Sequence, residues 1–430
     1  MPRLTSSPPP LVGHVSMPGD KSISHRALMI AALARGRSRI VGCNSGTDVA
    51  ATRAALVALG AEVSDTTTGV VEVEGCAGAG GLHEPPDVID VGNSGTSLRC
   101  LAGVAAGLPG SVVLTGDASV RARPMLRVVV PLRAMGASID GRRYGDRAPL
   151  AIRGGDLQAI DHVGDVASAQ VKTAVLLAAL SARGTTSVTE PRLSRDHSER
   201  MLGAAGVALR RTGTKVSVDG PAVPEARDWI VPGDISAALF LIVGALIVPG
   251  SDLVIENVGL NPTRAAALDV LRAMGATIET EITDERDGEP RGRVRVRHAR
   301  LSATEVRDEL GPALIDEVPA LAIAASVAEG TTLFDGVEEL RVKESDRIAA
   351  MVDGLHALGV AAESTPGGFT VTGGSLGEGR IDPLGDHRIA MAFAIAGLAA
   401  TGRVTVGGWS CVDTSFPGFL DTLAEAREPR

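Results

Sequence analysis

Six apolar segments of helix length recur along the chain, each followed by a glycine and a short β-branched run. The segments are 23–34, 96–108, 171–182, 237–248, 320–328 and 389–400, and the glycines after them, from Gly36 to Gly402, lie 66 to 80 residues apart. Helices that are apolar on nearly all sides are typically buried among other elements. The runs that follow, such as SRIVG, SVVLTG and SDLVIEN, predict strands, and the glycines are expected to be left-handed helix caps.

A second recurrence marks another helix in most of these intervals. Similar phrases end helical stretches at 58–63 (ALGAEV), 134–139 (AMGASI), 204–209 (AAGVAL), 273–278 (AMGATI) and 357–362 (ALGVAA). Six α/β units of about 70 residues predict two lobes of three. We place the boundary near Pro232–Gly233, where a Pro-Gly break precedes the fourth buried helix. A solenoid is the competing interpretation, but its repeats are normally shorter and more regular.

The buried helices begin with unusually polar residues. These openings read GDKS at 19–22, GNSGT at 92–96, SAQ at 168–170, GDIS at 233–236, DE at 316–317 and DHR at 386–388. N-capping explains Asp234 and Ser236. It does not explain Lys21, Arg26 or Arg388, because a cation opposes the helix dipole at an N-terminus unless an anion binds there. The openings therefore predict an anion site.

Composition excludes several classes of protein. The 430 residues include 51 acidic and 42 basic side chains, a net charge of -9, and few aromatic residues, which argues against a nucleic-acid binder. The four cysteines form no CxxC pair, so neither a disulfide scaffold nor a zinc ribbon is expected. No apolar run reaches the roughly 18 residues of a membrane helix. A cytoplasmic protein without membrane contact is the expectation.

Basic residues are concentrated in short motifs. Lysine is rare, occurring only at 21, 172, 215 and 343, and a lysine kept among so many arginines indicates a need for a compact, titratable ammonium. Arginines cluster at 121, 123, 195, 264, 341 and 347, which predicts a site for phosphates and carboxylates. Candidates for proton transfer are Asp316, Glu344, His387 and Lys21. The sequence contains no GxSxG, P-loop or HExxH motif, and no metal site is expected.

Seven motifs, taken together and in order, resemble the 5-enolpyruvylshikimate-3-phosphate synthase family. They are GDKSISHRA at 19–27, GNSGTSLR at 92–99, RARPM at 121–125, SAQVK at 168–172, RVKESDR at 341–347, DHRIAMAF at 386–393 and TSFPGF at 414–419. The resemblance implies transfer of the enolpyruvyl group of phosphoenolpyruvate to the 5-hydroxyl of shikimate-3-phosphate. Phosphate leaves through a tetrahedral intermediate, without metal or cofactor. This is the sixth step of the shikimate pathway to chorismate and the aromatic amino acids.

The resemblance also implies a fold. The family is a two-lobed inside-out α/β barrel, the enolpyruvyl transferase fold, with six repeats of a βαβαββ unit, three in each lobe. Here the first lobe would span 20–233, and the second would combine 1–19 with 234–430. The lobes are expected to close over the substrates, since helix N-termini that face one another repel until an anion binds. A monomer is expected.

Residue roles follow from the motifs by resemblance. Asp316 is expected to be the base at the hydroxyl, and Glu344 with Lys21 the proton relay at the methylene carbon. Shikimate-3-phosphate would be held by Lys21, Ser22, Arg26, Ser168, Ala169, Gln170, Arg195, Asp316 and Lys343. Phosphoenolpyruvate would be surrounded by Lys21, Gly95, Arg123, Gln170, Arg347 and Arg388. Two highly charged anions require such cations before they can approach each other.

Two positions depart from well-known members of the family. Thr414 stands where some members have a Lys that reaches phosphoenolpyruvate. Glu339 stands where some members have an Asn that touches the ring of the acceptor. The motifs are similar to those of the subgroup called class II, which includes glyphosate-tolerant enzymes. The most tolerant members carry Ala in place of Gly95, so we expect inhibition by glyphosate here.

Two alternatives are weighed against this interpretation. UDP-N-acetylglucosamine enolpyruvyl transferase shares the six-unit fold, but it normally has a reactive Cys in a loop of the first lobe. The corresponding stretch here, 117–127, contains no Cys. A non-catalytic repeat scaffold whose arginines bind an acidic partner is the other. A scaffold would need neither Asp316 nor Glu344.

Overall fold

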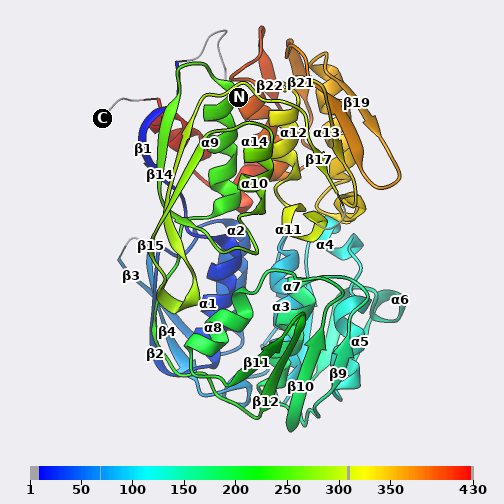
Figure 1. Ribbon diagram of the computed structural model, residues 1–430. Helices are drawn as coiled ribbons and strands as arrows, with labels where there is room; N and C mark the ends of the chain where they lie inside the picture. Colours follow the sequence, from blue (N-terminus) through cyan, green and yellow to red (C-terminus); the bar gives the residue numbers. More distant parts are fainter. Residues whose placement is uncertain (1–8, 68, 308–309, 428–430) are drawn as a thin grey trace. The chain divides into compact units, whose positions relative to one another are not determined.

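The computed structural model describes residues 9–67, 69–307 and 310–427. The chain divides into two compact units (Figure 1). The N-terminal unit contains 19–231 together with 286–289, and the C-terminal unit contains the described residues of 1–18, 232–285 and 290–430. The short segment 286–289 therefore packs with the N-terminal unit, although it interrupts the sequence of the other.

The N-terminal unit contains three four-stranded sheets of one design. Their strand orders are β13-β2-β4-β3, β5-β6-β8-β7 and β11-β12-β10-β9. In each sheet one pair is parallel and the others are antiparallel. The strands are β2 (Arg35–Val41), β3 (Glu62–Thr67), β4 (Val70–Cys76), β5 (Ile89–Asp90), β6 (Ser111–Thr115), β7 (Ser138–Gly141), β8 (Arg147–Arg153), β9 (Asp161–Val163), β10 (Gly184–Thr189), β11 (Leu209–Thr212), β12 (Lys215–Gly220) and β13 (Asp228–Ile230).

Three buried helices form the core of this unit. They are α1 (Lys21–Leu33), α3 (Gly95–Ala106) and α7 (Ala169–Ala179), and α3 contacts both of the others. A parallel strand pair needs a crossover connection, and α3 and α7 supply it between β5 and β6 and between β9 and β10. The remaining helices are α2 (Thr47–Ala58), α4 (Ala118–Ala122), α5 (Leu126–Ala134), α6 (Arg142–Gly145) and α8 (His197–Ala204).

The C-terminal unit repeats this design with one shorter sheet. Its orders are β1-β14-β16-β15, β17-β18-β20-β19 and the parallel pair β21-β22. The buried helices are α9 (Ile235–Ile247), α12 (Val318–Ala325) and α14 (His387–Ala396). The strands are β1 (Val12–Ser16), β14 (Asp252–Gly259), β15 (Ile278–Asp284), β16 (Arg291–Arg297), β17 (Glu305–Val306), β18 (Thr331–Phe334), β19 (Ala361–Ser364), β20 (Phe369–Thr372), β21 (Gly379–Ile381) and β22 (Val404–Val406).

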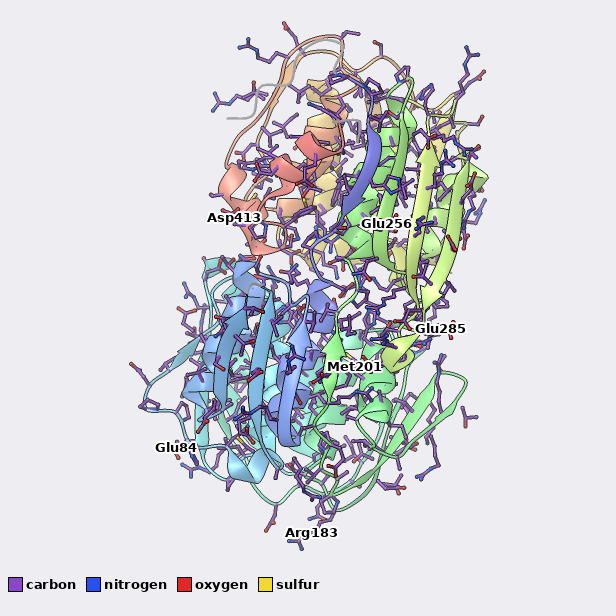
Figure 2. The ribbon with its side chains drawn as sticks, turned by 90° about the vertical axis from the view of Figure 1, so that its left-hand side faces the viewer. Glu84, Arg183, Met201, Glu256, Glu285 and Asp413 are labelled. Atoms are coloured by element: carbon purple, nitrogen blue, oxygen red, sulfur yellow. The ribbon has the colours of Figure 1, made fainter. Side chains whose placement is uncertain are left out.

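The other helices of this unit are α10 (Ala266–Ala273), α11 (Gly311–Leu314), α13 (Arg347–Ala357) and α15 (Phe419–Glu425). Phe419 of α15 packs edge-on against Phe240 of α9, with ring centroids 6.3 Å apart. The solvent side of the β14–β16–β15 sheet carries ion pairs, such as Arg293 with Glu256 of β14 (Figure 2). Among the described residues, no helix is long and apolar enough to cross a membrane.

Each unit contains a sheet whose edge strand comes from a distant part of the sequence. β13 pairs in parallel with β2, so that Asp228 lies opposite Arg39. β1 pairs in parallel with β14, so that Val12 lies opposite Asp252. These two pairings close both units across the long sequence intervals between their parts.

The glycine caps lie in different places from those predicted. The six buried helices end three to six residues before the glycines at 36, 110, 184, 250, 330 and 402, of which Gly110 and Gly402 do not have a positive φ. The left-handed caps instead end the second helices. After α2, for example, Gly60 has φ 94°, and Ala61 N donates to Leu56 O at 2.9 Å, as in a Schellman motif. The equivalent glycines are Gly136, Gly206, Gly275 and Gly359.

Candidate active site

In the C-terminal unit, three carboxylates surround one buried guanidinium. Arg347, the first residue of α13, donates from Nε to Asp386 Oδ2 at 2.7 Å, from Nη1 to Asp316 Oδ1 at 3.0 Å and from Nη2 to Glu344 Oε2 at 2.6 Å. Burial alone would lower the pKa of Arg347, but the charges of Asp386, Glu344 and Asp316 raise it above its ordinary value. The predicted base and the predicted proton relay therefore share one cation.

Asp386 organises the second cation of this cluster. Its side chain caps α14 by accepting from Arg388 N at 2.9 Å, as Asp does at helix starts. Arg388 Nη1 then donates to the carbonyl oxygen of Asp316 at 2.7 Å, and its Nε lies 3.7 Å from Asp316 Oδ1. Two guanidiniums thus contact Asp316, which lies just before α12.

Lys343 stands beside the same carboxylates. Burial lowers the pKa of the Lys343 ammonium, and Arg347 lowers it further, while Asp316, Glu339 and Glu344 act in the opposite direction. A lysine in this setting is a titratable cation close to the candidate base.

In the N-terminal unit, Lys21 opens the first buried helix. Asp20 caps α1 by accepting from Ile23 N at 2.8 Å. Lys21 Nζ lies 3.0 Å from Asp48 Oδ2, on the neighbouring helix α2. The ion pair holds the ammonium at a helix N-terminus, where the dipole also favours an anion.

Arg26 lies one turn further along α1 and is buried. Its guanidinium donates to three neutral oxygens, Ser22 O, Ser198 Oγ and Thr173 Oγ1, each at 2.8 Å. These acceptors fix its orientation without themselves neutralising its charge. Burial lowers the pKa of Arg26, and the nearby charge of Arg195 also lowers it. A buried guanidinium that donates only to neutral oxygens favours a bound anion.

The opening of α7 is joined to the opening of α3. Ser168 caps α7, its Oγ accepting from Val171 N at 3.5 Å. Gln170 Oε1 accepts from Arg99 Nη1 at 2.8 Å, and Gln170 Nε2 donates to Thr96 Oγ1 at 2.9 Å. The amide of Gln170 is therefore oriented by both hydrogen bonds.

Gly95, the first residue of α3, leaves space for a guanidinium. A Cβ at this position would lie 2.6 Å from Arg123 Nη1 and 3.3 Å from Arg99 Nη1. Arg123 is buried. Ser94 caps the helix by accepting from Ser97 N at 3.2 Å. Arg123 thus approaches a helix N-terminus that exposes backbone rather than side chain.

The structure sorts the predicted residues into two clusters. The cluster of the N-terminal unit contains Lys21, Ser22, Arg26, Gly95, Arg123, Ser168, Ala169, Gln170 and Arg195, and that of the C-terminal unit contains Asp316, Lys343, Glu344, Arg347 and Arg388. Thr414 lies in a short 3₁₀ segment, with its Oγ1 donating to Cys411 O at 2.8 Å. Within the described chain, no group of three or more His, Cys, Asp or Glu side chains could hold a metal ion.

Sequence reasoning missed three residues that hold predicted site residues in place, and its interpretation of Ser236 as a helix cap was wrong. Asp48, Arg99 and the carboxylate of Asp386 each hold a predicted residue. Asp386 stands in a polar helix opening, so the signal was present, whereas Asp48 is an acidic residue in the first turn of α2, a common position for Asp that indicates no site. Ser236 does not cap α9. Its hydroxyl instead donates to Glu317 and accepts from Arg264, while Asp234 makes the cap.

The comparisons with known proteins agree with this geometry. The family model described as EPSP synthase (3-phosphoshikimate 1-carboxyvinyltransferase) matches residues 6–423. The 3-phosphoshikimate 1-carboxyvinyltransferase of Gloeobacter violaceus is 52% identical over 421 residues, covering 97% of both chains. That of Geobacter sp. (strain M21) is 50% identical, covering 96% of both. An EPSP synthase structure from Acinetobacter baumannii matches with a TM-score of 0.88 and 40% identity, covering 99% of this chain and 97% of that one.

Proposed function

The chain belongs to the EPSP synthase family, the 3-phosphoshikimate 1-carboxyvinyltransferases, and on that premise we propose how its residues divide the reaction. The enzyme transfers the enolpyruvyl group of phosphoenolpyruvate to the 5-hydroxyl of shikimate-3-phosphate and releases phosphate, a step of the shikimate pathway. The predicted family and mixed α/β fold are confirmed. The residue roles are our proposal.

Asp316 takes the proton of the 5-hydroxyl, so that its oxygen attacks C2 of phosphoenolpyruvate. The methylene carbon receives a proton through Glu344 and Lys21, which gives the tetrahedral intermediate. Removal of a proton from the new methyl group then restores the double bond as phosphate leaves. The observation that supports this assignment is the sharing of Arg347 by Asp316 and Glu344, at 3.0 and 2.6 Å.

The cations and helix openings hold the substrates. In the N-terminal unit, Arg26 and Arg195 bind the phosphate side of shikimate-3-phosphate, together with Lys21, Ser22, Ser168, Ala169 and Gln170. Asp316 and Lys343 contact the same substrate. The groups assigned to phosphoenolpyruvate are Lys21, Gly95, Arg123, Gln170, Arg347 and Arg388. The reason is electrostatic, since fixed cations offset the repulsion between two anionic reactants.

The test is phosphate release from phosphoenolpyruvate, with shikimate-3-phosphate and UDP-N-acetylglucosamine as rival acceptors and EDTA present. We expect release only with shikimate-3-phosphate. Release with UDP-N-acetylglucosamine would favour the other enolpyruvyl transferase, and release with neither would favour a binding role.

We also propose that the enzyme acts as a monomer in the cytoplasm, without a cofactor, a membrane or nucleic acid as partner. The acidic composition and scarcity of aromatic residues support the last point. Light scattering coupled to size exclusion measures the mass directly, and a mass of twice 43.9 kDa would contradict the monomer.

A further inference from the structure

Lys172 is buried in α7, one turn after the SAQ opening, and has no role in the assignment above. Its Nζ lies 2.7 Å from Glu190 Oε2 and 2.8 Å from Glu199 Oε1. The three side chains are 2%, 3% and 9% exposed, respectively. Burying one ammonium between two carboxylates costs free energy, because all three charges lose water. The other contacts of the two carboxylates therefore indicate what the group does besides packing.

Glu190 joins two segments that carry predicted ligands of the substrate phosphate. Its Oε1 accepts from the backbone N of Ser168 at 3.0 Å and from Ser194 Oγ at 2.6 Å. Its Oε2 accepts from Lys172 Nζ and from the backbone N of Ser194 at 3.4 Å. Ser194 directly precedes Arg195. One carboxylate therefore fixes the start of α7 relative to the segment that bears Arg195.

Glu199 faces the cations of the same region. It lies in α8, the helix of Met201 in Figure 2, and follows Ser198, the acceptor of Arg26 Nε. Its charge favours protonated Arg26, whereas the charge of Arg195 disfavours it. Through Lys172 and Ser198, α8 is therefore connected both to the buried carboxylates and to the guanidinium of Arg26.

We propose that Lys172, Glu190 and Glu199 form a buried positioning group for the phosphate of shikimate-3-phosphate. Glu190 ties Ser168 to the segment that bears Arg195, Glu199 ties Lys172 to α8, whose Ser198 orients Arg26, and Lys172 keeps both carboxylates in place. None of the three touches the substrate. This inference depends on the proposed function, because Arg26, Ser168 and Arg195 are ligands only in that assignment.

A merely structural ion pair makes a different prediction. Its loss would lower the melting temperature and affect both substrates alike. A positioning group affects shikimate-3-phosphate selectively, so the ratio of the two KM values separates the two cases.

The experiment uses Glu190→Gln and Ser194→Ala in the full-length enzyme. Both oxygens of Glu190 accept hydrogen bonds, whereas the amide that replaces the carboxylate has an NH2 group in place of one oxygen. The hydrogen bonds to that oxygen are lost, so we expect the Kd and KM for shikimate-3-phosphate to rise at least about tenfold. Ser194→Ala removes one neutral hydrogen bond, for which about a threefold rise is expected. The KM for phosphoenolpyruvate should change much less, because Gln170, the residue of this opening assigned to both substrates, is held separately by Arg99 and Thr96, and kcat at saturation should stay unchanged. Lys215→Met is the matched control, a lysine of the same unit paired with Asp161 at the surface.

Arg195→Gln separates failure of this inference from failure of the assignment. If wild-type enzyme and Arg195→Gln bind shikimate-3-phosphate equally, the assigned phosphate site is wrong. If Arg195→Gln binds weakly while Glu190→Gln and Ser194→Ala bind as wild type, or if both KM values change in parallel, the positioning group is refuted. Should Glu190→Gln fail to fold, Ser194→Ala decides alone by the same ratio.

Discussion

Lys21 and Asp48 form an ion pair between α1 and α2, with 3.0 Å from Nζ to Oδ2, and both side chains are largely buried. Lys21 is the first residue of its helix, where the dipole disfavours a cation. Asp48 supplies the negative charge that holds the ammonium there. Lys21 is assigned to both substrates and to proton transfer, so Asp48 affects the reaction without a substrate contact of its own.

Replacing Asp48 by Asn should therefore weaken catalysis. The charge that fixes Lys21 is lost while the shape is kept, and we expect kcat/KM to fall about tenfold. Steady-state kinetics with each substrate measures the effect. Asp65→Asn, which affects the exposed pair of Asp65 with Arg53, is the control. Equal kinetics in the two variants would show that Lys21 is held by other contacts.

Asp316→Asn should retain binding and lose turnover. The amide oxygen can still accept from Arg347, but it cannot take the hydroxyl proton, so kcat should fall by about 10² to 10⁴. Isothermal titration with shikimate-3-phosphate checks binding, and phosphate release checks turnover. Asp269→Asn, in the exposed pair of Asp269 with Arg272, is the control. A fully active Asp316→Asn enzyme would favour the scaffold interpretation.

Lys343 should set an alkaline limit on substrate capture. Burial lowers the pKa of its ammonium below the ordinary 10.5, so the cation is present at pH values below that lowered pKa and lost as the pH rises through it. The kcat/KM for shikimate-3-phosphate reports the pKa values of groups in the free enzyme. It should therefore fall on the alkaline side of the pH profile, over the range in which Lys343 loses its proton. Lys343→Arg should move this fall to higher pH, because guanidinium stays protonated. Superimposable profiles would exclude Lys343 as their source.

Gly95→Ala should weaken glyphosate inhibition. The added methyl group would lie 2.6 Å from Arg123 Nη1, so the guanidinium has to shift and the longer inhibitor is crowded. We expect the KM for phosphoenolpyruvate to rise, and the Ki for glyphosate to rise further, by at least about tenfold. The ratio of Ki to KM is the measurement. A wild-type Ki far above the KM for phosphoenolpyruvate would contradict the expected sensitivity.

Alkylation of thiols should leave the enzyme active. Burial raises the pKa of Cys43 to about 11, and burial with the nearby Asp386 raises that of Cys411 to about 11. The reactive thiolate is then scarce at pH 7, so iodoacetamide should react slowly. Activity followed alongside mass spectrometry checks this. Inactivation in step with modification of a single thiol would reveal a cysteine that the reaction needs.

Local pattern was enough to predict the buried helices, whereas most of the candidate residues were named through motifs that resemble the family, and their roles stay predictions. The apolar runs identified all six helices, each starting about two residues earlier than predicted, because the polar openings belong to the first turn or cap it. Lys21, Gln170 and Arg347 were found because they stand in distinctive motifs. The two clusters are thus largely encoded in short segments.

Partners that are distant in sequence could not be predicted in this way. Asp48 meets Lys21 only through the packing of α1 on α2, and nothing in its own segment distinguishes it. Lys172 was interpreted as a compact, titratable ammonium, yet it is buried between two carboxylates from other segments. Likewise, residues 286–289 join the N-terminal unit through contacts such as Glu289 with His197, 92 residues apart.

The pairing of β1 with β14 has a consequence for synthesis on the ribosome. Leu11 and Ser251, which are hydrogen-bonded beside this pairing, are 240 residues apart, and the whole of 19–231 is translated between them. The N-terminal unit, apart from residues 286–289, can therefore complete its sheets before β14, the partner strand of β1, has been synthesised. An unpaired strand is prone to associate with other chains. The segment of β1 thus stays unpaired until β14 leaves the ribosome, and only then can it join its sheet.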